Sequence, residues 1–261
     1  MTAPQSWVWD GSSFVPCNGI PISDRGFRYG MALFESLAIR GGKVEFLEAH
    51  LERLTTACRG CGWPVDPAVL ACAGKQLSQG LDSMFARIYI TAGEGGPVAP
   101  VTTPRIFLYV EPRESLPMQR LRVGLHREPF LPVLGGTKTT NYWGNIAALQ
   151  NARETGEDEA LLFNPHGCLI SSCMANVFVE VEGRLMTPHL ASGARAGVVR
   201  EWVIQSREVV QSDLSREEVS QASACFLTSC WTGIAPVAVL DGRPLHTSLG
   251  ETLHAEFFSR E

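Results

Sequence analysis

The stretch KTTNYWGNIAALQNARETGEDEALLFNPHGCLISSCMANVF, residues 138–178, determines how the rest of the chain is interpreted. Lys138 stands just before a helical pattern, in a run of glycine, threonine and asparagine. Two short apolar runs follow, and the second ends in the polar cluster Ser171-Ser172-Cys173. A lysine that is partly desolvated between a loop and a core has a lowered pKa and becomes a nucleophile for carbonyl carbons. The alternative is an ordinary solvated lysine, and the local sequence by itself favours that alternative.

The bulk composition is typical of a globular protein in water. The chain has 261 residues, of which 45% are hydrophobic and 19% charged. Its net charge of −5 and the absence of a basic run make nucleic acid an unexpected partner. No run of about 18 apolar residues and no leader pattern occur, so we expect no membrane span and a cytoplasmic location.

The eight cysteines are irregularly spaced, which favours reduced and mostly buried thiols over a disulfide framework. Cys58 and Cys61 form a single Cys-x-x-Cys motif inside a helical pattern. A zinc site needs about four ligands, and no second pair or histidine partner follows. We therefore expect no metal site.

Periodicity and turn residues predict a mixed α/β (α+β) protein. Strands are expected at 7–9, 14–16, 32–39, 86–90, 106–110, 121–126, 160–163, 168–170, 177–181, 184–186, 224–228 and 237–240. Helices are expected at 47–61, 69–81, 145–154, 197–206, after a capping box at Ser215, and at 249–258. The segment 24–26 is expected to be irregular. The proline-containing segment 111–119 is the expected linker. It separates a smaller N-terminal α/β domain, residues 1–114, from a larger C-terminal domain, residues 115–261, that carries the lysine and the turns near Gly197 and Ser229.

Three blocks of the sequence resemble the fold-type IV pyridoxal-phosphate (PLP) enzymes. The first is DRGFRYGMALFES (24–36) with FLEAHLERL (46–54), and the second is the lysine block. The third is SGARAGVVREWVI (192–204) with FLTSCWTGIAPV (226–237). This family contains the branched-chain and D-amino-acid aminotransferases and 4-amino-4-deoxychorismate lyase. The resemblance implies the two-domain fold of D-amino-acid aminotransferase, pyridoxal 5′-phosphate as cofactor, an amino compound as substrate, and a homodimer.

The resemblance also implies roles for single residues. Lys138 corresponds to the lysine that forms a Schiff base with the cofactor and later moves a proton, and Tyr142 would lie near the cofactor's phenolic oxygen. Arg53 corresponds to a phosphate-binding arginine. The backbone N–H groups of Val198 and Val199 would hold the phosphate at a helix N-terminus, and Ser229 would be a third phosphate contact.

The sequence departs from the family pattern at Ser171. The family has a glutamate there, which pairs with the pyridine nitrogen and keeps it protonated. A hydroxyl group leaves that nitrogen mostly unprotonated and makes the ring a weaker electron sink. Ser171 therefore puts ordinary transamination in doubt more than it does cofactor binding.

Three functions follow from these observations. The first is a lyase resembling 4-amino-4-deoxychorismate lyase of folate biosynthesis, which releases pyruvate and leaves 4-aminobenzoate. The length of the chain, the stretch IYITAGEGG (88–96) and the missing glutamate favour it. The second is an aminotransferase for D- or branched-chain amino acids, although no paired arginine or histidine groups appear at 97–104. The third is a non-catalytic or PLP-free paralogue that acts as a binding module.

Overall fold

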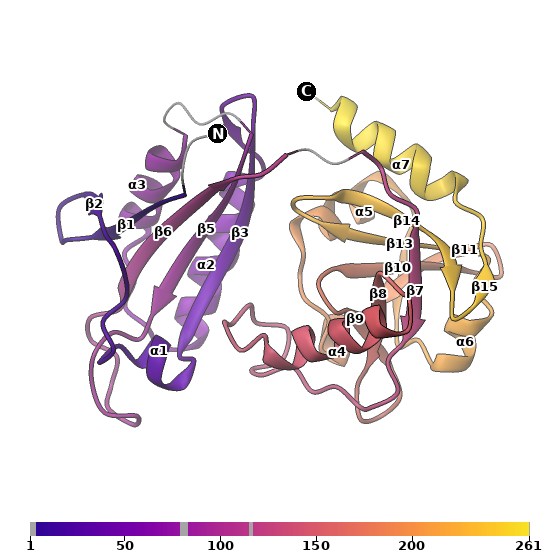
Figure 1. Ribbon diagram of the computed structural model, residues 1–261, viewed down its shortest axis with the longest axis horizontal. Helices are drawn as coiled ribbons and strands as arrows, with labels where there is room; N and C mark the ends of the chain where they lie inside the picture. Colours follow the sequence, from indigo (N-terminus) through magenta and orange to yellow (C-terminus); the bar gives the residue numbers. More distant parts are fainter. Residues whose placement is uncertain (1–3, 79–82, 115–116, 261) are drawn as a thin grey trace. The chain divides into compact units, whose positions relative to one another are not determined.

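The computed structural model describes residues 4–78, 83–114 and 117–260, and the chain folds into two compact units. The first unit comprises Met1–Ser115 and Thr137–Asn141, and the second comprises Leu116–Gly136 and Tyr142–Glu261. Figure 1 labels most of the elements of each unit. Both combine sheets with helices, so the predicted mixed α/β class is confirmed.

The first unit is built on a six-stranded antiparallel sheet in the order β2-β1-β6-β5-β3-β4. Its strands are β1 (Gln5–Trp9), β2 (Phe14–Pro16), β3 (Ala32–Arg40), β4 (Lys43–Val44), β5 (Met84–Thr91) and β6 (Arg105–Pro112). Its helices are α1 (Arg25–Tyr29), α2 (Leu47–Gly60) and α3 (Pro67–Leu77).

The strands of this sheet alternate between two faces. Leu37 of β3 and Ile88 of β5 lie on the buried face and pack with Leu54 of α2 and Leu70 of α3. The next residues along the same strands, such as Arg87, lie on the opposite face. That face carries most of the polar and aromatic side chains discussed below.

Helix α1 was not expected from the sequence. Asp24 caps it by accepting a hydrogen bond of 2.6 Å from the backbone N–H of Gly26. Arg25 is buried and donates to the backbone carbonyls of Gly93 (3.2 Å) and Ala99 (2.7 Å). A helix of five residues is too short to give a recognisable periodicity, so the prediction of an irregular segment was wrong here.

The second unit contains a nine-stranded sheet in the order β12-β11-β10-β13-β14-β7-β8-β9, with β15 paired to β14. Its strands are β7 (Leu121–Leu125), β8 (Glu159–Phe163), β9 (Leu169–Ser172), β10 (Asn176–Val181), β11 (Arg184–Pro188), β12 (Val210–Ser212), β13 (Ala224–Ser229), β14 (Gly233–Leu240) and β15 (Arg243–Pro244). Its helices are α4 (Trp143–Glu154), the 3₁₀ turn η1 (Leu190–Ser192), α5 (Val198–Ser206), α6 (Arg216–Ser220) and α7 (Ser248–Ser259).

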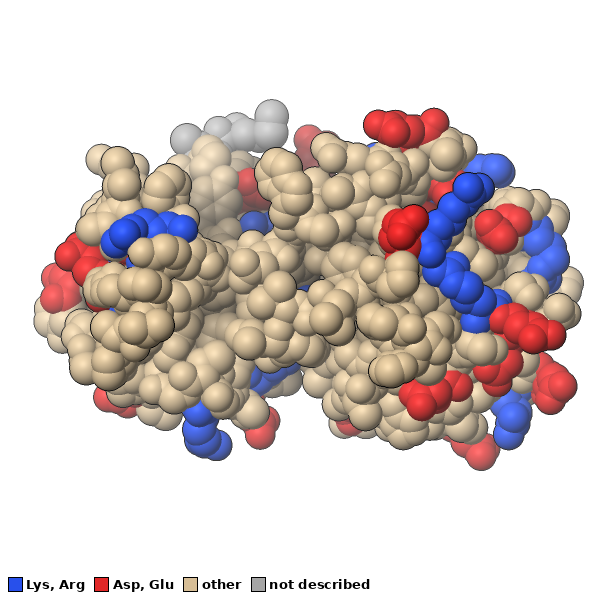
Figure 2. Space-filling model, turned by 90° about the horizontal axis from the view of Figure 1, so that it is seen from below, with Lys and Arg blue, Asp and Glu red and all other residues tan. Residues whose placement is uncertain are grey.

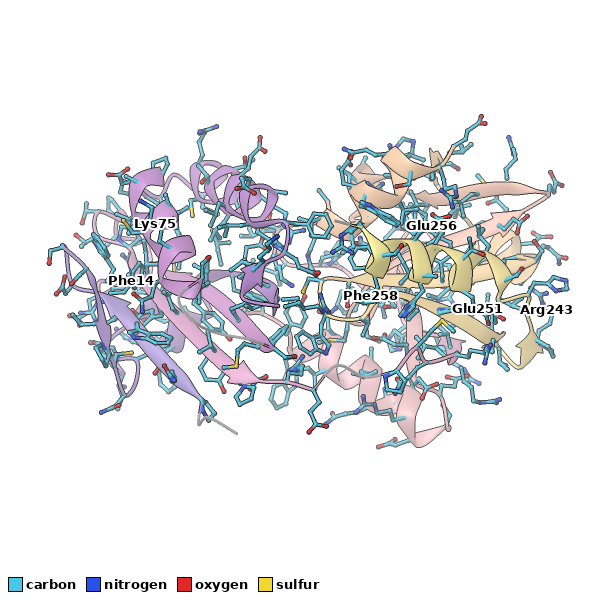
Figure 3. The ribbon with its side chains drawn as sticks, turned by 90° about the horizontal axis from the view of Figure 1, so that it is seen from above. Phe14, Lys75, Arg243, Glu251, Glu256 and Phe258 are labelled. Atoms are coloured by element: carbon cyan, nitrogen blue, oxygen red, sulfur yellow. The ribbon has the colours of Figure 1, made fainter. Side chains whose placement is uncertain are left out.

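A local sequence signal in the second unit agrees with the structure. Ser215 and Glu218 form the predicted capping box at the start of α6. Helix α7 carries Glu251 and Glu256, labelled in Figure 3, which pair with Arg120 and Arg207. Figure 2 likewise shows basic and acidic side chains interspersed on the visible face of this unit.

The short segment Thr137–Asn141 packs with the first unit, although the sequence assigned its lysine to the C-terminal domain. The physical reason is backbone pairing along β3. Phe34 N–H donates to the carbonyl of Lys138, and Thr140 N–H donates to the carbonyl of Ala32, each at 3.0 Å. Lys138 is therefore held against β3.

Candidate active site

Lys138 lies over an aromatic ring of the first unit. Its Nζ is 4.2 Å from the centroid of the Phe34 ring, and its backbone is paired with the strand that carries this phenylalanine. The side chain is only partly exposed. Its charge also contributes to lowering the pKa of His50, after the larger effect of burial. The lysine is thus partly desolvated, as a carbonyl-binding amine requires.

A charged cluster lies on the face of β3 that packs against α2. The carboxylate of Glu35 accepts hydrogen bonds from Arg53 Nε (2.7 Å) and Arg53 Nη2 (2.5 Å), and it contacts His50 Nδ1 at 2.7 Å. Burial alone raises the pKa of Glu35, but the Arg53 charge and the hydrogen bonds from His50 and Arg53 outweigh it and hold the pKa at about 2. Glu35 is therefore a buried anion that fixes Arg53.

The sequence pointed to Arg53 alone in this cluster. His50 and Arg53 are three residues apart on α2 and so share a helix face, which was a readable signal. Glu35 is a single acidic residue in an otherwise apolar strand, and a buried acid needs a partner. Each signal marks one side of the cluster, but only the tertiary structure shows that the strand residue meets the helix residues.

Arg87 is a candidate site residue that was not expected from the sequence. It lies on the face of β5 opposite to the one that packs against α2 and α3, and its Nη1 donates to the Tyr89 hydroxyl at 2.8 Å. Its guanidinium carbon is 5.2 Å from the centroid of the Phe85 ring and 5.5 Å from that of Phe34. Phe34 therefore contacts both Lys138 and Arg87. Residues 97–104 follow strand β5, whereas Arg87 lies within that strand.

A cavity of about 540 Å³ opens beside this arginine. Arg87, Tyr89, Tyr109 and Glu111 contribute to its lining. Arg87 Nε is buried and has no hydrogen-bond partner among the described residues. A guanidinium framed by aromatic rings is a suitable donor for a carboxylate on an unsaturated or aromatic ligand.

In the second unit, the N-terminus of α5 has the features of an anion site. No side chain caps it among the described residues, and Gly197 at the N-cap is extended, so the N–H groups of Val198 and Val199 open the helix. A Cβ atom on Gly197 would lie 2.0 Å from Asn176 Oδ1, so only glycine fits. The uncapped N–H groups are what a phosphate group needs, and the glycine lets Asn176 pack against this turn.

Asn176 joins this turn to the strand that bears Ser229. It pairs with Thr228 of β13, and its Nδ2 donates to the carbonyl of Arg195 at 2.8 Å. Ser229 Oγ lies 2.6 Å from Thr232 Oγ1 and accepts from the Thr232 N–H at 3.2 Å. The second unit thus brings together the two turns that the sequence identified separately.

The remaining predicted residues also lie in the second unit. Tyr142 is the N-cap residue of α4, and its hydroxyl accepts a hydrogen bond of 2.8 Å from Arg195 Nη1. Ser171 is partly exposed on β9, opposite Leu162 of β8.

Glu159, at the start of β8, is a titratable group that the sequence did not reveal. Burial raises its pKa to about 7, although hydrogen bonds involving Ser172 and Cys173 act in the opposite direction. Its Oε2 is buried and has no hydrogen-bond partner among the described residues. A carboxyl group with this pKa is half protonated near neutrality.

We expect Glu159→Gln to change the pH dependence of stability. The pKa of Glu159 is raised from 4.5 to about 7, so the folded state binds more protons than the unfolded state between these values. Stability therefore falls as the pH rises through this window, by on the order of 3 kcal/mol. The glutamine variant should lack this fall in urea unfolding measured from pH 4.5 to 7.5. Glu154→Gln, at an exposed position of α4, is the control. An unchanged slope in the Glu159 variant would contradict the prediction.

Each of the two units carries one feature that points to a class of enzyme. A partly desolvated lysine offers a covalent link to a carbonyl group, and a glycine-opened helix N-terminus offers a phosphate site. These are the two attachments that a phosphorylated aldehyde cofactor requires. The described residues contain no cluster of metal-ligating side chains.

The chain belongs to the family described as amino-transferase class IV, whose sequence profile matches residues 32–240. Its members use pyridoxal 5′-phosphate, so the chain is a PLP-dependent enzyme of this class, and the predicted family and cofactor are confirmed. Within the described part of the chain, no helix has the length and apolar character of a membrane span.

Relatives with two different activities match nearly the whole chain. The aminodeoxychorismate lyase of Vibrio harveyi is 25% identical over 245 residues, covering 86% of this chain and 88% of its own. The branched-chain-amino-acid aminotransferase of Escherichia coli K12 is 24% identical over 272 residues, covering 92% and 87%. The crystal structure of 4-amino-4-deoxychorismate lyase from Pseudomonas aeruginosa superimposes with a TM-score of 0.82 and 29% identity, covering 96% of this chain and 97% of that chain. The two-domain fold-type IV architecture is therefore confirmed.

Proposed function

We propose that this enzyme is a 4-amino-4-deoxychorismate lyase, which releases pyruvate from its substrate and leaves 4-aminobenzoate for folate biosynthesis. We further propose that it acts in the cytoplasm as a homodimer. The observation that carries the proposal is Ser171, a hydroxyl group at the position where the family has a carboxylate. Elimination followed by aromatisation has its own driving force, so it needs less electron withdrawal from the cofactor ring than transamination does.

The cofactor, when bound, withdraws electrons from the carbon that loses a proton. Lys138 supplies the amine that bonds the cofactor's aldehyde carbon and afterwards moves that proton. Its backbone pairing with β3 supports this role, because that pairing fixes where the amine lies beside Phe34.

The phosphate would be held by the N–H groups of Val198 and Val199 and by the hydroxyl of Ser229. The start of α5, where no described side chain caps the helix, supports this assignment. Arg53 would add a cation whose orientation Glu35 fixes.

Arg87 would bind a carboxylate of the substrate. Aminodeoxychorismate is an unsaturated ring with carboxylate groups, and the aromatic frame of Phe34, Phe85 and Tyr89 suits such a ring. The cavity of about 540 Å³ beside Arg87 has the size of a small-molecule site.

The second candidate is an aminotransferase for D- or branched-chain amino acids. The similarity to the Escherichia coli branched-chain enzyme over 92% of this chain favours it. The third possibility from the sequence, a PLP-free binding module, is not supported by membership of a PLP-dependent enzyme family.

The test is a pyruvate assay with PLP-loaded protein and aminodeoxychorismate in the absence of an amino acceptor. A lyase releases pyruvate and 4-aminobenzoate in equal amounts over many turnovers. An aminotransferase instead releases no pyruvate: it passes the substrate's amino group to the cofactor once, stops, and resumes when a 2-oxo acid is added to take up that amino group. That second result would overturn the lyase proposal in favour of the aminotransferase.

Ser171→Glu should shift the balance of the two reactions. A carboxylate next to the pyridine nitrogen raises its pKa by roughly one or more units, and each unit is worth about 1.4 kcal/mol. Conversion to pyridoxamine phosphate should then become roughly tenfold faster relative to pyruvate release. Single-turnover absorbance with a panel of amino acids measures the first rate, and Ser171→Gln controls for side-chain size. If the wild type already transaminates as fast as the variant, Ser171 does not limit the reaction, and the reason for preferring a lyase is lost.

A further inference from the structure

Arg195 and Tyr142 form a side-chain pair in the second unit. Arg195 Nη1 donates to the Tyr142 hydroxyl at 2.8 Å, and the guanidinium carbon lies 5.6 Å from the centroid of the Tyr142 ring. An arginine can only donate hydrogen bonds, so the phenolic oxygen is the acceptor here. A phenol that accepts a hydrogen bond through its oxygen can still donate one through its O–H group.

The charge of Arg195 is not neutralised by a neighbouring acid. No acidic side chain in the described part of the chain forms an ion pair with it. Its Nε is buried and has no hydrogen-bond partner among the described residues. A buried donor on an uncompensated cation is stabilised by an anionic acceptor.

The backbone of Arg195 is fixed beside the candidate phosphate turn. Its carbonyl accepts hydrogen bonds from Asn176 Nδ2 (2.8 Å) and from the Gly197 N–H (2.9 Å). Gly197 opens α5, and Tyr142 precedes α4. The pair therefore links the starts of the two helices that carry predicted cofactor contacts.

We propose that Arg195 and Tyr142 form a paired donor site for one anionic oxygen, with Tyr142 donating its hydroxyl proton and Arg195 supplying the positive charge. Two oxygens have this chemistry: the phenolic oxygen of the cofactor ring and a carboxylate oxygen of the substrate. The inference rests on the proposed function, because that function supplies the cofactor and the carboxylate-bearing substrate whose oxygens the pair would bind. Toward the cofactor, Arg195 is a positioning residue that acts through Tyr142.

The first arm of the test titrates the visible absorbance of PLP-loaded protein with pH, without substrate. Two hydrogen-bond donors on the cofactor's phenolic oxygen stabilise the anionic form of that oxygen. They therefore lower the pKa of the proton that this oxygen shares with the Lys138 nitrogen. Arg195→Leu and Tyr142→Phe should then each raise the midpoint by about one pH unit, and Arg195→Lys should restore part of the shift. The double variant should shift less than the sum, since both residues act on one oxygen.

The second arm measures equilibrium binding of two probes, 4-aminobenzoate and aniline, which differ by one carboxylate. If the oxygen belongs to the substrate, Arg195→Leu should weaken the binding of 4-aminobenzoate about tenfold. The binding of aniline and the absorbance midpoint should then stay unchanged. Arg120→Leu removes the same charge from an exposed pair with Glu251 in the same unit and should change neither arm.

The outcomes separate this inference from the proposed function. A midpoint shift assigns the pair to the cofactor, and a selective loss of 4-aminobenzoate assigns it to the substrate. A normal absorbance band with both arms unchanged in the two Arg195 variants and in Tyr142→Phe overturns the inference while the cofactor assignment stands. A wild type without any visible band, and without a borohydride-fixed adduct on Lys138, contradicts the proposed function itself.

Discussion

Replacing Lys138 by alanine is expected to remove the covalent attachment of PLP and to reduce turnover by roughly 10³-fold or more, since the same amine bonds the cofactor and moves the proton. The sequence contains only three lysines, Lys43, Lys75 and Lys138, so the attachment can be located without ambiguity. Borohydride reduction of PLP-loaded wild type should fix a pyridoxyl group on the peptide that contains Lys138. Mass spectrometry of the digested protein measures this directly.

The control is Lys75→Ala on α3, where the removed lysine projects from a helix of the first unit (Figure 3). This variant should retain the visible absorbance, the adduct on Lys138 and full turnover. An adduct on Lys43 or Lys75 in the wild type would show that Lys138 is not the attachment point.

Glu35→Gln is expected to lower the free energy of unfolding by about 3 kcal/mol at pH 7. Glu35 is a buried anion bonded to both Arg53 and His50, and removing one member of a buried ion pair leaves the other charge uncompensated. This loss lies at the low end of the range usual for breaking a buried ion pair, because the Arg53 side chain is 20% exposed to solvent. Urea unfolding of the cofactor-free protein measures this loss.

The dependence of stability on pH under acidic conditions gives an independent measurement of the ionisation of Glu35. Its pKa is lowered from 4.5 to about 2, so the unfolded state binds more protons between these values and stability is lost as the pH falls through them. Glu35→Gln should remove this part of the loss. The control Glu94→Gln breaks an exposed pair with Arg105 and should cost less than 1 kcal/mol. Equal losses in the two variants would contradict the description of Glu35 as a buried, paired anion.

Loss of Glu35 should also lower the affinity of the protein for the cofactor. Glu35 fixes two nitrogens of Arg53, the predicted phosphate-binding arginine. Without that carboxylate, Arg53 has more rotamers to lose when it binds a phosphate.

Much of the fold was readable from local sequence signals. The hairpin of β1 and β2, the long helix α2, the turn before α5 and the capping box of α6 lie where periodicity and turn residues put them. Short elements without periodicity, such as α1 and β4, were not readable. Their conformations depend on partners far away in the chain, as the contacts between Arg25 and the carbonyl of Gly93 show.

The sequence by itself determined the family, the cofactor and the candidate residues that lie in local motifs, above all Lys138 and the turn at Gly197. Those signals are local because a helix N-terminus and a glycine requirement arise within a few residues. Only the tertiary structure revealed the partners. It brought Glu35 to Arg53, Arg87 to the Phe34 ring and Arg195 to Tyr142. The physical reason is that burial and charge interactions depend on distance in space, and these pairs are separated by 18, 53 and 53 residues along the chain, the last two across intervening strands and helices.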